Sequence, residues 1–176
     1  LDERGMPPVD PSTTRIGDLP VFMAGDANGD RALLHEAADE GHIAGLNAVA
    51  PQPICFERRT PMGVVFCDPN VATVGLRFDQ LDDSRTIIGE ADFHRQSRAR
   101  MTGRDRGIAR VYADRESGRL LGAAMCVPDA EHLAHMLVLA VGQSLTVGDM
   151  LRMPVYHPVL EEGLRGAFRD LARQLP

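Results

Sequence analysis

Two residues near the C-terminus have the types and spacing of a catalytic base with its orienting acid. His157 precedes Pro158 in the segment MPVYHPVLEEGLRGAFRDL, and Glu162 lies five positions after the histidine. Proline is favoured at the first position of a helix, so a helix is expected from Pro158, with His157 at its N-cap. A carboxylate beside an imidazole orients the ring and fixes its tautomer, as a general base requires. A capped surface helix with glutamates near the positive end of its dipole explains the same spacing.

A second candidate lies near the N-terminus, where the apolar run at residues 21–24 stops at Gly25 and Asp26. The run predicts a short strand, followed by a tight turn and a helix over residues 31–49. An aspartate at the carboxyl end of a strand lies where α/β sheets bind ligands, and its carboxylate can accept hydrogen bonds from ligand hydroxyls. A turn-forming aspartate is the alternative.

Other polar clusters give weaker signals. The segment HRQSRAR at residues 94–100 could bind an anion, but no aromatic residues interleave, which favours a solvated loop between strands. His132 and His135 are three positions apart, yet further ligands cannot be assigned, so no metal site is predicted. No serine lies in a G-x-S-x-G context, which argues against a serine hydrolase.

The composition limits the class of protein. The 176 residues are 44% hydrophobic and 25% charged, with a net charge of -6, as in a globular protein that does not bind nucleic acid. No apolar run approaches the roughly 20 residues that span a membrane, and no signal peptide is visible, so we expect a cytoplasmic protein. Cys55, Cys67 and Cys126 fit no metal or redox spacing, and the last two are expected to be buried. The first residue is not Met, as expected for a fragment or processed product.

The pattern of elements changes along the chain. Residues 1–50 predict one strand, a turn and a helix, which cannot bury two faces without neighbours. Prolines mark a linker over residues 51–60. Residues 61–176 predict about five strands, at 63–67, 72–78, 86–93, 108–114 and 119–127, followed by helices from residue 129, Thr146 and Pro158. The fold class is therefore α+β, with an antiparallel sheet.

Four motifs occur in an order that resembles one enzyme family. They are VFMAGD at 21–26, LLHEAADEG at 33–41, VFCDPNVATVG at 65–75 and HPVLEE at 157–162. Together they resemble the C-terminal part of the flavin-dependent pyridine nucleotide-disulfide oxidoreductases, with the closest likeness to dihydrolipoamide dehydrogenases. Val155 and Val159 depart from that likeness, because those enzymes commonly carry a histidine and a threonine at the matching positions.

The resemblance implies a role for each part of the chain. Residues 1–50 would close an FAD-binding domain, with Asp26 at a flavin ribityl hydroxyl and with Leu34 and His35 passing the flavin ring. Residues 61–176 would form the dimerisation domain of a homodimer. His157 would be the base toward a thiol or disulfide substrate such as lipoamide, held by Glu162, in the active site of the other subunit.

The family's first glycine-rich motif, its redox cysteine pair and its NAD domain do not occur in these residues. We therefore expect the chain alone to be inert, with NAD or NADP bound by another part of a longer protein. The alternative is a stand-alone dimerisation or interaction module without redox activity.

Overall fold

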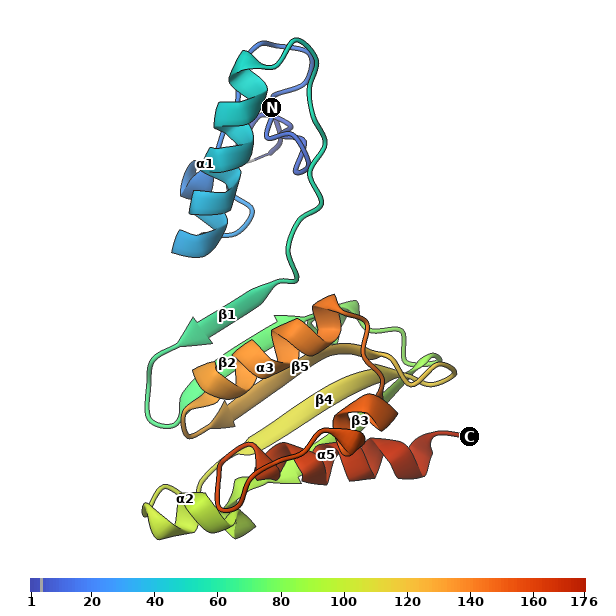
Figure 1. Cartoon of the computed structure of the whole chain (residues 1–176). Coiled ribbons are helices and arrows are strands. Elements are labelled where there is room, and N and C mark those ends of the chain that lie inside the picture. The colour runs from blue at the N-terminus through green and yellow to red at the C-terminus, as the bar shows by residue number, and fades with distance from the viewer. Residues whose placement is uncertain (4) are drawn as a thin grey trace. The chain divides into compact units, whose positions relative to one another are not determined.

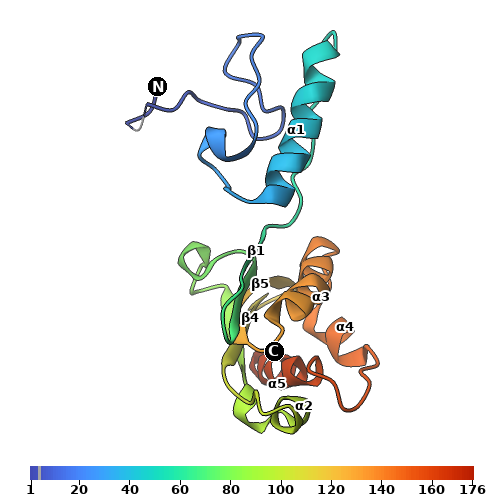
Figure 2. The same ribbon diagram turned by 90° about the vertical axis from the view of Figure 1, so that its left-hand side faces the viewer.

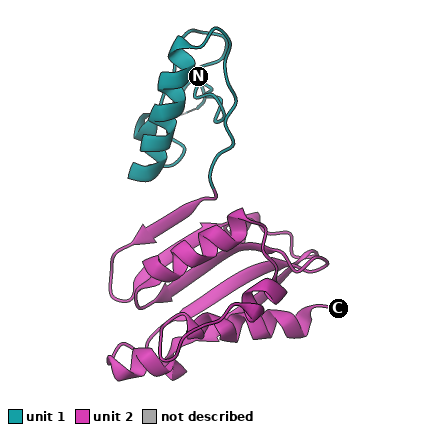
Figure 3. Ribbon diagram, viewed as in Figure 1, with its two compact units in different colours: residues 1–59 teal, residues 60–176 magenta. Residues whose placement is uncertain are grey.

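The structure, a computed structural model, describes residues 1–3 and 5–176. These residues form two compact units, Leu1–Arg59 and Thr60–Pro176, which are coloured separately in Figure 3. Within the described residues, no helix is both long enough and apolar enough to cross a membrane.

The second unit is built on a five-stranded antiparallel sheet (Figure 1). Its strands are β1 (Met62–Val65), β2 (Asn70–Gly75), β3 (Thr86–Asp92), β4 (Ile108–Asp114) and β5 (Leu120–Val127). Their order across the sheet is β1-β2-β5-β4-β3, and every neighbouring pair is antiparallel. The predicted α+β class with an antiparallel sheet is confirmed.

Helices cover one face of this sheet (Figure 2). The helix α3 (Ala130–Gly142) packs on β1, β2 and β5, whereas α5 (Glu162–Gln174) packs on β3 and β4. Between them, α4 (Val147–Arg152) packs on α5 and begins with a capping box in which Thr146 and Asp149 exchange hydrogen bonds. Alternate strand residues such as Val111 and Met125 meet Leu137 and Leu171 in a core that excludes water.

The α-helices α3 and α5 cover only one face of the sheet, which corrects the expected burial of two cysteines. All three cysteines are exposed. Cys126 alternates with the buried Met125 and Val127 on β5, so its thiol points away from the helices. Cys67 lies in the loop after β1. The prediction was wrong because an apolar run shows that a strand is present, but not which of its residues face the helices.

The first unit contains one long helix, α1 (Leu34–Val49), preceded by a short 3-10 helix, η1 (Gly25–Asn28). The expected strand over residues 21–24 does not form. A single isolated bridge joins Arg15 to Phe22, and the backbone of this segment bonds to the preceding loop. A strand needs a neighbouring strand to take its ladder hydrogen bonds, and the described part of this unit provides none.

The last helix begins later than expected, at Glu162 rather than Pro158. Residues 157–161 form turns, and the peptide bond between His157 and Pro158 is cis. The Glu162 carboxylate accepts a hydrogen bond from the Val159 amide at 3.2 Å, so these turns stand directly in front of the helix. His157 is therefore not an N-cap residue, since Glu161 takes that position.

Candidate functional site

The predicted histidine and glutamate are in direct contact. His157 Nδ1 lies 2.9 Å from Oε1 and 3.1 Å from Oε2 of Glu162. An ionised carboxylate can only accept, so Nδ1 donates and the neutral ring leaves the lone pair on Nε2. The described residues provide no hydrogen-bond partner for Nε2, and 67% of the His157 side chain is exposed. The ring thus presents a proton acceptor to solvent in a fixed orientation.

Glu162 is held more firmly than the histidine. It is the first residue of α5, and 28% of its side chain is exposed. The hydrogen bond from His157, helped by the bond from the Val159 amide, lowers the pKa of the Glu162 carboxyl below its ordinary value. The acid therefore stays ionised over the range in which an imidazole acts as a base.

Gln96 supports the turn that carries the pair, a role that no motif in the sequence indicated. Its side chain is 6% exposed and lies before the short helix α2 (Ser97–Met101). Gln96 Nε2 donates to the Val159 carbonyl at 2.6 Å, while its Oε1 accepts from the Ala99 amide at 2.7 Å. The turn is thus tied to a segment about 60 residues earlier in the chain.

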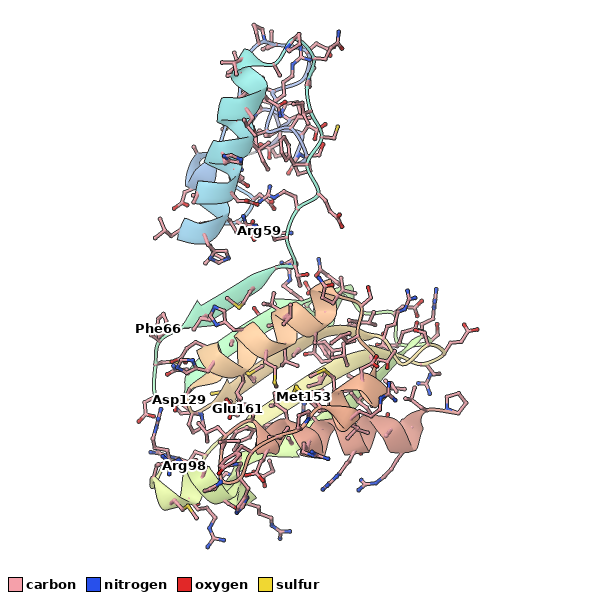
Figure 4. The ribbon with its side chains drawn as sticks, viewed as in Figure 1. Arg59, Phe66, Arg98, Asp129, Met153 and Glu161 are labelled. Atoms are coloured by element: carbon pink, nitrogen blue, oxygen red, sulfur yellow. The ribbon has the colours of Figure 1, made fainter. Side chains whose placement is uncertain are left out.

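The adjacent glutamate does not contribute to the pair. Figure 4 labels Glu161 on the segment between α4 and α5. It lines a separate surface cavity of about 310 Å³ together with Arg98 and Asp129. The Glu161 carboxylate makes no hydrogen bond or ion pair within the described ranges, so the two neighbouring glutamates have different environments.

The residues predicted to contact a flavin lie together at one corner of the first unit. Asp26 is in η1, which packs against α1, and Leu34 and His35 open α1. Leu34 is 88% exposed, and the His35 side chain is 52% exposed. The Asp26 carboxylate makes no hydrogen bond or ion pair with residues 1–3 or 5–176. These exposed groups, one of them an unengaged acceptor, fit a ligand that carries hydroxyls and a flat apolar ring.

A buried ion cluster behind this corner was missed by sequence reasoning. Glu36 and Glu40 are 3% and 0% exposed. One amino group of Arg58 lies 2.6 Å from Glu36 and 3.0 Å from Glu40, and the other Glu40 oxygen accepts from the Gly25 amide at 2.7 Å. Burial alone would raise the pKa of Glu36, but hydrogen bonds from Arg58 and Arg31 outweigh it and lower that pKa. Acidic residues four apart usually indicate a solvated helix face, which is why the pattern concealed a buried one.

Three further histidines make local contacts. His135 Nδ1 lies 2.6 Å from the Glu131 carbonyl, and the His132 ring lies 3.8 Å from the Glu131 carboxylate. His94 pairs with Asp92 at 2.9 Å. No group of three or more metal-ligating side chains is found in the part of the chain that the structure describes.

The sequence and the fold were compared with known proteins. Residues 61–168 match the family described as the pyridine nucleotide-disulphide oxidoreductase dimerisation domain. The chain belongs to this family. Its match covers the whole sheet together with α3, α4 and most of α5, and therefore includes His157 and Glu162.

Two relatives of this chain are both named dihydrolipoyl dehydrogenase. The chain is 35% identical over 144 residues to a dihydrolipoyl dehydrogenase of Halobacterium salinarum, covering 81% of the chain and 30% of that protein. It is 30% identical over 175 residues to one of Haloferax volcanii, covering 98% of the chain and 37% of that protein. The chain thus spans about a third of the length of these relatives.

Solved structures share the fold. LpdA of Mycobacterium tuberculosis is 25% identical, with a TM-score of 0.80 over 94% of the chain and 36% of that structure. An HOCl-induced flavoprotein disulfide reductase of Escherichia coli is 20% identical, with a TM-score of 0.81 over 96% of the chain and 39% of that structure. The sheet with its covering helices is therefore the fold of disulfide reductases.

Proposed function

We propose that this chain is part of an FAD-dependent disulfide oxidoreductase of the dihydrolipoamide dehydrogenase type. In this proposal the second unit provides the interface of a homodimer, and His157 is the base for a thiol or disulfide substrate such as lipoamide, whose reduced form, dihydrolipoamide, carries the thiols. The whole protein would use NAD or NADP, and the chain by itself would be inactive.

The contact between His157 and Glu162 carries this proposal. In the thiol step, Nε2 takes the proton from the substrate S–H, which leaves a thiolate able to attack a disulfide. The ring becomes an imidazolium whose charge the adjacent carboxylate stabilises. Glu162 is thus a positioning residue that acts through His157.

The exposure of the pair fits a site shared between subunits. The His157 side chain is two-thirds exposed, and no described residue forms a hydrogen bond with its Nε2. A base that serves its own unit would be expected to face a pocket of that unit. An outward-facing base is consistent with a substrate held by the other subunit.

The first unit would contribute to the cofactor site. Asp26 would accept a hydrogen bond from a flavin ribityl hydroxyl, while Leu34 and His35 would lie against the ring. Bound FAD would supply the electron transfer between the nicotinamide and the disulfide. The side chains of this unit would bind and orient the cofactor without taking part in that transfer.

Substitutions in the whole oxidoreductase test the base. We expect His157→Gln to lower the rate of dihydrolipoamide oxidation by about 10²–10⁴, since general base catalysis contributes that much. Glu162→Gln should lower it less, because the imidazole remains. Glu161→Gln is the matched control and should leave the rate unchanged. A His157→Gln enzyme with the parent kcat and KM would disprove the assignment.

A further inference from the structure

A groove beside the proposed base contains arginines without carboxylate partners. It has a volume of about 580 Å³ and lies between the end of β3 and the helix α5. Its charged lining residues are Asp92, Arg95, Glu162, Arg165 and Arg169. The volume is within the range of small-molecule sites, roughly 300–1,000 Å³.

Both carboxylates of the groove are already engaged. Asp92 accepts from the side chain and from the backbone amide of His94, each at 2.9 Å. Glu162 accepts from His157 and from the Val159 amide. Their strongest interactions are these hydrogen bonds, while Arg95 and Arg165 act on them only through longer-range charge attraction.

The three arginines of the groove form no such pairs. Among the described residues, no carboxylate oxygen lies within 4.0 Å of a side-chain nitrogen of Arg95, Arg165 or Arg169. The Arg165 Nε atom is also buried without a hydrogen-bond partner. A buried donor left unpaired is costly, so this arrangement favours an acceptor that comes from outside the chain.

Arginine is suited to recognise one class of acceptor. Its planar guanidinium matches the geometry of a carboxylate or a phosphate and can bind either with two parallel hydrogen bonds. Glu162 lines the groove and also holds His157, so an anion bound here lies next to the base. The groove could therefore bind the anionic group of a ligand whose sulfur lies at the pair of His157 and Glu162.

We propose that this arginine groove binds a carboxylate or phosphate of the disulfide substrate while the sulfur of that substrate lies at His157. The groove then gives an anionic disulfide an advantage over a neutral amide such as lipoamide as a substrate of the same site. This inference rests on the proposed function. The experiments below distinguish failure of the groove from failure of the proposed base.

The first experiment measures anion binding without any redox reaction. Inorganic phosphate and acetate are titrated into the chain at constant ionic strength and followed by backbone amide NMR. We expect shifts in residues 92–97 and 162–169. Arg169→Met and Arg95→Met should each weaken binding about tenfold, the effect of losing one charge-assisted hydrogen bond. The tighter of the two probes identifies the anion.

Arg173→Met is the matched control. Arg173 is on the same helix, one turn beyond Arg169, but it lies 3.8 Å from Asp170 and does not line the groove. Its loss should change phosphate binding less than twofold. Arg165 is left intact because it is half-buried and its removal could unfold the helix. Equal weakening by all three variants, or no shifts at the groove, overturns the proposed site.

The second experiment uses the whole oxidoreductase with two disulfides of equal size, one carrying carboxylates and the other neutral amides. We expect Arg169→Met to raise KM about tenfold for the anionic substrate alone. Equal effects on both substrates would overturn the advantage of the anionic disulfide. His157→Gln should lower kcat for both, so failure of the base assignment appears separately from failure of the groove.

Discussion

At the scale of single residues, the site depends on which atom of each side chain is engaged. The bond from Nδ1 of His157 to Glu162 leaves Nε2 as the only ring nitrogen that can take a proton. The sequence predicted the contact between these two residues, because the family that it resembles places a glutamate five positions after the histidine. It could not identify Gln96, whose contact with the Val159 carbonyl joins distant segments.

The tautomer of His157 is the first testable consequence. We expect the neutral ring to carry its proton on Nδ1, because the carboxylate of Glu162 can only accept. Glu162→Ala removes that acceptor, and the ring should then populate both tautomers. Two-bond ¹H–¹⁵N correlation spectra of the chain, at a pH where the ring is neutral, distinguish them. Glu161→Ala is the control, and an unchanged tautomer ratio in Glu162→Ala would show that the carboxylate does not orient the ring.

At the scale of elements, α5 positions the pair by packing closely on the sheet. A Cβ atom built on Gly163 would lie 2.5 Å from the ring of Phe93, which is 0% exposed. On the next turn, a Cβ on Gly166 would lie 3.5 Å from its nearest neighbour, Ala91, an ordinary contact. Gly163 therefore allows the start of the helix to approach Phe93, in the turn that follows β3, whereas Gly166 does not have that role.

These two glycines form a matched pair for a stability test. Gly163→Ala should lower the free energy of unfolding by about 1–3 kcal/mol, because the buried Phe93 ring cannot move aside. Gly166→Ala should raise it by up to about 1 kcal/mol, since alanine favours the helix more than glycine. Urea unfolding of the chain measures both. Similar changes in the two variants would contradict the close approach at Gly163.

The elements also show what a sequence can and cannot predict. The strand over Ile108–Asp114 was predicted with its observed ends, because Ala109, Val111 and Ala113 alternate with other residues and all three are buried. The start of α5 was placed four residues early, since the Glu162 side chain bonds the Val159 amide and turns precede the helix. The strand at residues 21–24 was wrong for a different reason, as a strand depends on neighbours that local residues do not reveal.

At the scale of the whole molecule, the two units are stabilised by different interactions. The second unit has a continuous apolar core. In the first unit, Ile43 is the one buried hydrophobic residue among those described, beside buried polar residues that include Glu36 and Glu40. Arg58 neutralises both glutamates, so loss of this one side chain would leave buried charges unpaired in a unit with little apolar core.

Removing Arg58 should therefore unfold the first unit selectively. Arg58→Met leaves two buried carboxylates without their main partner, at a cost of about 3–5 kcal/mol. Hydrogen exchange should then accelerate in α1 and stay unchanged in the sheet of the second unit. Arg59→Met is the control, because Arg59 is 76% exposed and pairs with Asp39. Its effect should stay within about 0.5 kcal/mol.

The loss of stability in Arg58→Met should depend on pH in a defined direction. The folded pKa of Glu36 lies below its unfolded value of 4.5, so its contribution to stability is present above pH 4.5. That contribution is lost as the pH falls through the folded pKa. In Arg58→Met, burial opposes ionisation of Glu36. Protonation of the Glu36 carboxylate therefore stabilises the first unit of the variant, whereas it destabilises that unit in the parent. The difference in α1 exchange between the two proteins should narrow below pH 4.5; a difference that widens there would mean that Glu36 is not the group Arg58 stabilises.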